Sequence, residues 1–278
     1  MLYRMDRRDF LKKTAFASVA AYSSLSAVGC TLARGVGQAK EEDAPPFASL
    51  RLRPANERGS FKLSWLDARY SFSFSGYRDP AHTRYRALRV LNEDRIAPGG
   101  GFPIHPHRDM EILTYILRGQ LTHRDTLGHG GTIYRGEIQR MSAGRGIRHS
   151  EFNHSGEETH LLQIWLFPDR AGDDPSYEES RLPPLSSGEL VKIASPEGGG
   201  GIVSFGSDAH VYAAEVGSGQ SLAHLVSGGR GAYLHLARGA VQVNGILMES
   251  GDAVYSLSEG AMELIAHEPS ELLLFDLA

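Results

Sequence analysis

Short apolar stretches separated by glycine, proline and aspartate recur along the chain from residue 47 to the end. They occupy residues 61–66, 70–74, 87–91, 111–117 and 160–167, and then 211–216, 231–237, 240–244, 253–257 and 271–275. Stretches of this length bounded by turn residues are typical of β-strands, and no sustained helical periodicity accompanies them. The pattern predicts an all-β protein with two strand-rich units in tandem, each a β-sandwich or β-barrel.

Two polar segments divide the chain. Residues 169–188 carry Asp173-Asp-Pro and Pro183-Pro and lack periodicity, so we expect a linker between a first unit at 47–168 and a second unit at 189–278. Residues 31–46 are small, polar and charged, which predicts a tether before the first unit.

Residues 1–30 have the pattern of an export signal. A basic head with Arg-Arg-Asp-Phe-Leu-Lys at 7–12 precedes an uncharged stretch at 14–29 that is too short for a comfortable membrane span. The order of the head resembles the twin-arginine signal, which implies a periplasmic or outer-side location; an amphipathic N-terminal helix is the alternative. Met1 and Met5 are both possible starts, and both keep the motif. Cys30 follows a segment that loosely resembles a lipoprotein cleavage box, so membrane attachment through a lipidated Cys30 and ordinary signal cleavage both stay open.

Composition narrows the chemistry. Hydrophobic residues make up 41% and the formal net charge is −4, so there is no basic excess to hold a phosphate backbone and nucleic acid is not expected as a partner. The single cysteine excludes an intrachain disulfide and a thiolate-rich metal centre. Any metal must therefore be held by nitrogen and oxygen.

Two residue pairs with i, i+2 spacing predict such a site. They are His105-Pro-His107 and His149-Ser-Glu151. Residues i and i+2 of a strand point to the same face, so two neighbouring strands would supply three imidazoles and one carboxylate to one point. This ligand set suits Fe(II), Mn(II), Ni(II), Co(II), Cu(II) or Zn(II) and leaves positions for substrate and dioxygen. The alternative is that these are ordinary histidines and acids on strands.

The same region resembles the cupins. The spacing from Gly99 through the first histidine pair to Glu111 is similar to the first cupin motif, and the segment from Gly136 to His149 is similar to the second. Ser142 stands where the second motif usually has proline, and His149 comes two residues later than in the general pattern.

Within the cupins, residues 105–115 and 141–151 resemble pirin, specifically its bacterial quercetinase-type relatives, and the similarity spans residues 47–278. The resemblance implies a double cupin with iron in the N-terminal barrel and with His105, His107, His149 and Glu151 as ligands.

The remaining candidates are expected to be structural. We expect Glu111 behind the ligands or packed as a buried acid, and His123 and His129 exposed on either side of the turn at 126–128. The second unit has no His-x-His pair and is expected to lack a metal; its scattered histidines are His210, His224, His235 and His267.

The resemblance implies a monomeric metal-dependent dioxygenase that cleaves a flavonol such as quercetin with O2 and releases carbon monoxide. A Lewis acid favours loss of the substrate hydroxyl proton, and Glu151 is its expected acceptor and catalytic residue. Two alternatives remain: a non-enzymatic iron-binding pirin that acts as a redox-responsive protein partner, and a cupin with non-oxygenase activity.

Overall fold

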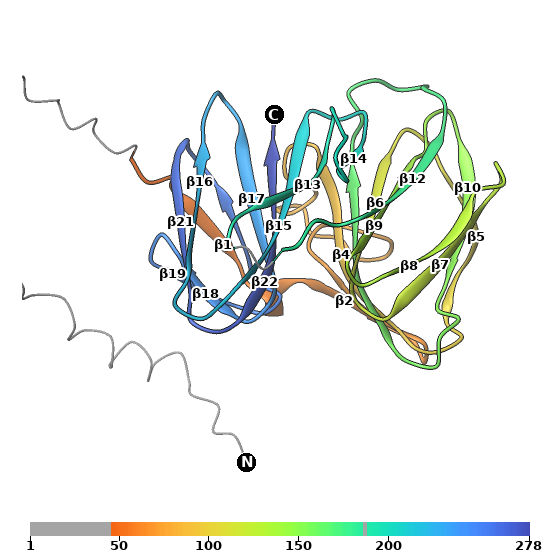
Figure 1. Ribbon diagram of the computed structural model, residues 1–278, viewed down its shortest axis with the longest axis horizontal. Helices are drawn as coiled ribbons and strands as arrows, with labels where there is room; N and C mark the ends of the chain where they lie inside the picture. The colour runs from red at the N-terminus through yellow and green to blue at the C-terminus, as the bar shows by residue number, and fades with distance from the viewer. Residues whose placement is uncertain (1–45, 186–187) are drawn as a thin grey trace, which may run out of the picture. The chain divides into compact units, whose positions relative to one another are not determined.

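The computed structural model describes residues 46–185 and 188–278, which form the strands β1 to β22 and one short 3-10 turn, η1 (Ala55–Glu57) (Figure 1). The strands build two β-barrels, so the predicted all-β double-cupin fold is confirmed. The expected export signal, nearly all of the expected tether and Cys30 lie outside the described residues. Within the part that is described, no helix is long and apolar enough to cross a membrane.

The first barrel combines a seven-stranded and a four-stranded antiparallel sheet. The large sheet has the order β12 (Ser176–Arg181), β9 (Glu137–Ser142), β6 (Glu111–Arg118), β11 (Thr159–Leu166), β4 (Leu88–Ile96), β3 (Leu66–Tyr70), β2 (Gly59–Lys62). The small sheet has the order β5 (Gly101–His107), β10 (Ile147–Phe152), β7 (Gln120–Asp125), β8 (Gly130–Tyr134).

The second barrel repeats this plan. Its large sheet has the order β1 (Leu50–Arg53), β20 (Ala253–Ser256), β17 (Gly231–Arg238), β22 (Ser270–Leu277), β15 (Ala209–Val216), β13 (Val191–Ser195), β14 (Val203–Ser204). Its small sheet has the order β16 (Ser221–Val226), β21 (Gly260–Ala266), β18 (Ala240–Val243), β19 (Ile246–Glu249).

Two strands depart from the predicted division of the chain into a first unit, a linker and a second unit. β1 comes first in the chain but pairs with β20, so it belongs to the large sheet of the second barrel. β12 lies inside the segment 169–188, the expected linker, and it pairs along its whole length with β9 of the first barrel. Both are edge strands with one partner each, and pairing between distant segments leaves no local periodic signal.

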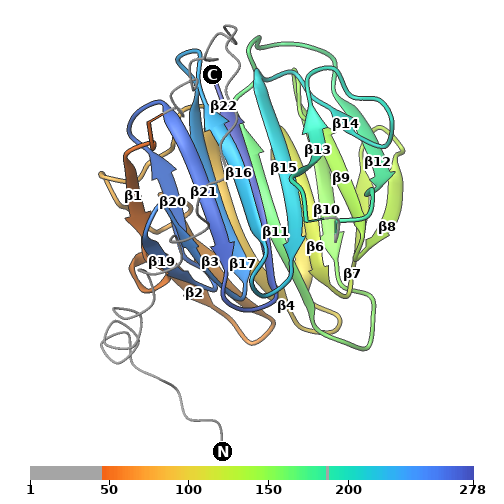
Figure 2. The same cartoon turned by 60° about the vertical axis from the view of Figure 1, so that its left-hand side comes forward.

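The two large sheets share one hydrophobic core. It contains residues of both barrels, among them Leu91 and Leu162 from the first and Tyr233 and Phe275 from the second. β11 and β22 are the central strands of the two large sheets (Figure 2). Both are buried almost throughout, which accounts for their nearly continuous apolar sequences.

The interiors of the two barrels differ in polarity. The second is filled by aliphatic side chains such as Leu236, Val241 and Met262. The first has an aliphatic cluster around Ile116 and Leu121, but it also buries histidines and carboxylates. Buried polar groups need partners, so the polar interior of the first barrel is the place to look for chemistry.

Candidate metal centre

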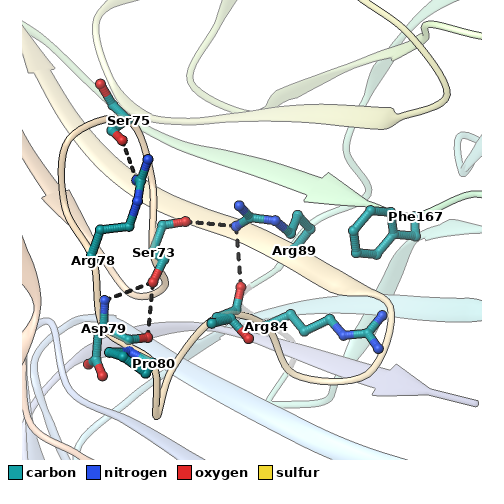
Figure 3. A pocket seen from close by; sticks show the side chains of 9 residues that line it. Ser73, Ser75, Arg78, Asp79, Pro80, Arg84, Arg89 and Phe167 are labelled. Atoms are coloured by element: carbon teal, nitrogen blue, oxygen red, sulfur yellow. Dashed lines mark hydrogen bonds between the residues drawn. The ribbon is translucent and has the colours of Figure 1, made fainter.

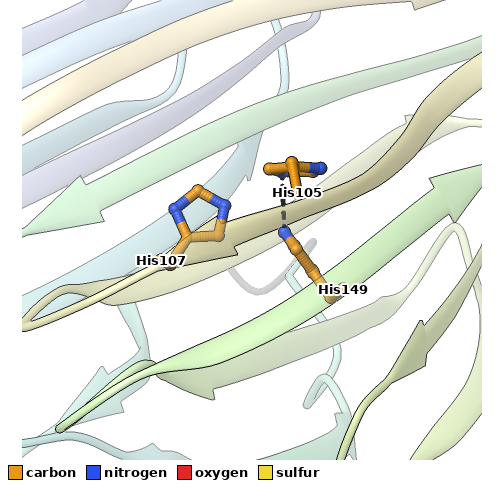
Figure 4. Close-up of side chains that lie close together, drawn as sticks. All are labelled: His105, His107 and His149. Atoms are coloured by element: carbon orange, nitrogen blue, oxygen red, sulfur yellow. Dashed lines mark hydrogen bonds between the residues drawn. The ribbon is translucent and has the colours of Figure 1, made fainter.

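Strands β5 and β10 bring the predicted histidines together inside the first barrel. The strands are antiparallel neighbours, and His149 lies directly opposite His105. His107 is two residues further along β5 and projects to the same face. The three imidazole rings face one another, with centroids 4.5 to 4.8 Å apart (Figure 4).

Hydrogen-bond partners assign the tautomer of His105. Its Nδ1 donates to the carbonyl oxygen of Pro103 at 2.8 Å, so its Nε2 carries the lone pair. That Nε2 lies 3.0 Å from Nε2 of His149.

A second chain of contacts assigns the tautomer of His149. Nε2 of His123 lies 3.4 Å from the carboxylate of Asp125, which can only accept a hydrogen bond when ionised. The other ring nitrogen of His123, Nδ1, is then an acceptor; Nδ1 of His149 lies 3.2 Å from it, and the Gln139 amide nitrogen lies 3.4 Å from it. His149 therefore also presents its Nε2 lone pair to His105. A histidine that binds metal through one ring nitrogen typically donates the other N–H to a fixed acceptor, as His105 does to Pro103 and His149 does to His123.

Two lone pairs in this position repel each other unless a cation lies between them. Two nitrogen ligands at right angles, each about 2.1 Å from a metal, lie about 3.0 Å apart. The Nε2–Nε2 distance of 3.0 Å between His105 and His149 matches this separation.

His107 completes a three-nitrogen site. Its Nε2 is buried and has no hydrogen-bond partner among the described residues. Burial and the neighbouring His149 and His105 lower the pKa of His107 to about 3, and burial and the neighbouring His105 and His123 lower the pKa of His149 to about 3. Both rings are therefore neutral at neutral pH, which is the state that binds metal. The residues fit a divalent transition metal.

Glu151 lies next to this cluster but is grouped differently. Its carboxylate and ring nitrogens of His123 and His149 come within 4.8 Å of one another, as do nitrogens of His105, His107 and His149 in the first group. His149 belongs to both groups, so the four predicted ligands do not form one tight set: the three histidines make the first cluster, and Glu151 joins His149 in a second cluster that also contains His123.

A defined hydrogen-bond chain holds Glu151. The Thr114 hydroxyl donates to Oε1 of Gln163 at 3.0 Å, which directs the Gln163 amide nitrogen to both oxygens of Glu151, at 3.1 and 3.3 Å. Burial raises the pKa of the Glu151 carboxyl, and nearby His123 and His105 oppose that rise. The nearby Asp94 is also buried, and burial with the charge of Glu151 raises its pKa to about 7.

Three residues of the site were not recognised from the sequence. His123 was expected to be exposed, and this is wrong: it is fully buried, directly opposite Glu151 on β7. The alternation of β7 could have indicated this, since Leu121 two residues earlier also points inward. Gln163 and Trp165 on β11 gave no sequence signal, yet Gln163 binds Glu151 and the Trp165 ring lies 4.8 Å from that of His107.

The other candidates lie elsewhere. Glu111 is a buried acid, as expected; it accepts a hydrogen bond from Ser142 and belongs to neither cluster. His129 is partly exposed beside Asp125. In the second barrel, His224 pairs with Asp276, and His235 is completely buried.

Comparison with known proteins agrees with this architecture. Residues 51–166 match the family model described as Pirin, and residues 192–277 match the model of the quercetinase C-terminal cupin domain. A putative quercetin 2,3-dioxygenase of Pseudomonas aeruginosa is 42% identical over 81% of this chain and 98% of its own length. The quercetin 2,3-dioxygenase of Escherichia coli K12 is 40% identical over 81% of this chain and 97% of its own length.

Solved structures give the same picture. The bacterial pirin YhhW of Escherichia coli in complex with nickel(II) is 39% identical, with a TM-score of 0.78 over 82% of this chain and 99% of that one. Another structure of YhhW has a TM-score of 0.80. From the two family matches and relatives aligned along nearly their whole length, the chain belongs to the pirin family.

Proposed function

We propose that this protein is a metal-dependent dioxygenase that cleaves a flavonol-type compound, with His105, His107, His149 and Glu151 as the metal ligands. The observation that carries the proposal is the pair of Nε2 lone pairs of His105 and His149, 3.0 Å apart. The names of the relatives from Pseudomonas aeruginosa and Escherichia coli support the reaction, and the nickel(II) complex of YhhW supports a divalent metal. Iron is the metal we expect.

A divalent metal at this site supplies a Lewis acid that favours ionisation of the flavonol 3-hydroxyl group. Glu151 is the proposed proton acceptor. Burial raises the pKa of its carboxyl, which brings the group closer to the range in which a general base works at neutral pH. The Gln163 amide holds both carboxylate oxygens and so fixes their orientation.

Aromatic side chains flank the histidines. The ring of Trp165 meets that of His107 edge to face at 4.8 Å, and Phe102 lies 6.5 Å from His105 in a similar arrangement. Trp65 packs edge to face against Phe102 at 5.3 Å. These rings suit a flat aromatic substrate, because aromatic pairs favour edge-to-face and offset contacts.

Ligand substitutions test the metal site. His105→Ala and His149→Ala should abolish tight metal binding, whereas His129→Ala should retain it, because His129 lies at the surface beside Asp125. Metal content after dialysis and competition with a chelating dye measure this. Unchanged metal binding in His105→Ala would disprove the ligand assignment.

A comparison of Glu151→Gln with His123→Ala shows whether Glu151 or His123 is a metal ligand. If Glu151 is both ligand and proton acceptor, Glu151→Gln lowers metal affinity moderately and flavonol turnover strongly. If His123 is instead a ligand, His123→Ala removes the metal and Glu151→Gln does not.

Oxygen uptake and carbon monoxide release with flavonols test the reaction. Both should appear in a one-to-one ratio in at least one of the Fe, Ni, Mn and Cu forms. Full metal occupancy without turnover in any form would overturn the proposal and favour a non-enzymatic metal-binding pirin.

The proposed location is outside the cytoplasm. It rests on the Arg7-Arg8 motif and the uncharged stretch that follows. Substitution of both arginines by lysine should retain the protein in the cytoplasmic fraction, and the mass of the mature N-terminus should show whether Cys30 carries a lipid. Unchanged fractionation of the double variant would contradict export by this route.

A further inference from the structure

A cavity of about 600 Å³ lies outside the histidine cluster. The loop between β3 and β4 forms most of its wall, and Phe167 just after β11 closes one side (Figure 3). The described charged side chains in its lining are Arg78, Asp79, Arg84 and Arg89.

The three arginines have no carboxylate partner among the residues that the structure describes. The Arg89 guanidinium donates to the carbonyl oxygens of Ser73 and Thr83, at 2.8 and 3.2 Å. Among the described residues, Arg78 likewise bonds only to backbone carbonyl oxygens, those of Ser75 and Tyr77. Carbonyl groups fix the direction of a guanidinium without cancelling its charge, so these arginines remain available to an anion.

Asp79 does not neutralise them. Its carboxylate accepts hydrogen bonds from Arg53 at 3.1 Å and from the Tyr77 hydroxyl at 3.1 Å, and it lies 2.8 Å from Nδ1 of His82. Burial raises the pKa of the Asp79 carboxyl, but His82, the Tyr77 hydroxyl and the backbone amide of Ala81 outweigh this effect and hold the pKa below its ordinary value. The negative charge of Asp79 is therefore directed to Arg53, and the cavity keeps a net positive charge.

The cavity also has an apolar aromatic wall. The guanidinium carbon of Arg84 lies 5.7 Å from the centroid of the Phe167 ring, a cation–π arrangement, and Pro80 adds further apolar surface. A site that combines guanidinium groups with an aromatic ring recognises a ligand that has both an acid group and a flat apolar body.

We propose that this cavity binds an aromatic carboxylate. The carboxylate pairs with Arg84 and the directed guanidinium groups of Arg78 and Arg89, and the ligand ring packs against Phe167. An inorganic anion such as phosphate would satisfy the arginines but would make no use of the apolar surface of Phe167 and Pro80.

The cavity is connected to the metal centre by direct packing. Ser73 and Ser75 line the cavity, and Phe74 between them packs on Trp165 at 5.4 Å, which in turn packs on His107 at 4.8 Å. Phe167 is two residues after Trp165 on the same segment.

The link to the reaction rests on the proposed function. In flavonol cleavage, C3 leaves as carbon monoxide with its oxygen, and the two atoms of dioxygen end on C2, as an ester carbonyl, and on C4, as a carboxylate. The hydroxyl proton balances the acid that forms. The product is thus an aromatic carboxylate, so the cavity would hold the product near the centre that makes it.

Calorimetry on the metal-loaded protein tests the binding without relying on turnover, with benzoate as the probe. We expect one benzoate site, with at least tenfold weaker binding of benzamide, acetate and phosphate. Arg84→Gln should weaken benzoate binding at least tenfold without lowering the melting temperature, because no polar contact of Arg84 is found in the described part of the chain. Phe167→Leu should weaken benzoate binding but not phosphate binding, and Arg170→Gln, which changes an exposed arginine paired with Asp173, should have no effect.

Other results would overturn the assignment. Benzoate binding that survives Arg84→Gln and Arg78→Gln but disappears in His105→Ala would place the ligand on the metal. Phosphate binding as tight as benzoate binding would mean a general anion site. The protein could also bind benzoate, with binding weakened by Arg84→Gln and Phe167→Leu, and yet turn over no flavonol. This result would support the cavity assignment and disprove only its link to the product.

Discussion

At the scale of the residue, the hydrogen bonds that hold Glu151 should determine how tightly the centre binds its metal. Gln163 donates to both carboxylate oxygens, and the Thr114 hydroxyl keeps the amide in this orientation. Gln163→Leu removes both donors and should lower metal affinity by about 10- to 100-fold, the range found for groups that orient metal ligands. Thr114→Val should have a smaller effect, because the amide can still reach Glu151.

Competition with a chelating dye measures both affinities. Gln242→Leu is the matched control, since Gln242 lies in the second barrel and bonds to a backbone carbonyl there. Equal metal affinity in Gln163→Leu and the unchanged protein would show that Glu151 does not bind the metal.

At this scale, the sequence predicted the residues whose spacing follows a strand. The pairs that start at His105 and His149 were found because positions i and i+2 share a face. His123 was misjudged because its position beside a turn hid the inward face of β7. Gln163 could not be predicted, because only the packing of β11 against β10 brings it to Glu151.

At the scale of the element, β1 connects the two barrels. Its backbone pairs with β20, while Leu50 and Leu52 pack on the core of the second barrel. The side chain of Arg53 turns to the first barrel and bonds to Asp79. The position of β1 could not be predicted, because about 200 residues of chain separate it from its partner and such pairing depends on tertiary contacts.

Leu52→Ser tests the role of β1. The loss of a half-buried leucine should lower the free energy of unfolding by about 1–2 kcal/mol. Tryptophan fluorescence reports Trp65 and Trp165 of the first barrel, and circular dichroism reports both barrels. Because the barrels share one core, Leu52→Ser should lower the urea midpoint of both signals together. Arg51→Ser, on the exposed side of the strand, should leave both midpoints unchanged. If Leu52→Ser shifted only the circular dichroism midpoint, the barrels would unfold independently.

At the scale of the whole molecule, the interface between the large sheets buries an unusual group, His235. The flanking residues Tyr233 and Ala237 belong to the shared core, and neither ring nitrogen of His235 has a hydrogen-bond partner in the described residues. Burial, aided by the positive charge of Arg58, lowers the pKa of His235 to about 3. The predicted double barrel is confirmed, but strand periodicity does not show which faces of the two barrels meet, so it does not place His235 in the interface.

The lowered pKa predicts how acid affects the interface. Between about pH 6.5 and pH 3 the unfolded chain binds a proton at His235 that the folded protein does not, so the stability present above pH 6.5 is lost as the pH falls.

His235→Leu removes this proton-binding group. The free energy of unfolding should then depend less steeply on pH, by up to about 1.4 kcal/mol per pH unit. At pH 7 the leucine variant should be at least as stable, because it replaces two unpaired ring nitrogens. His235→Gln separates the two effects: it should flatten the slope equally while gaining nothing at pH 7. Urea unfolding at several pH values measures both quantities, and an unchanged slope in both variants would mean that protonation of His235 does not limit the acid stability of the interface.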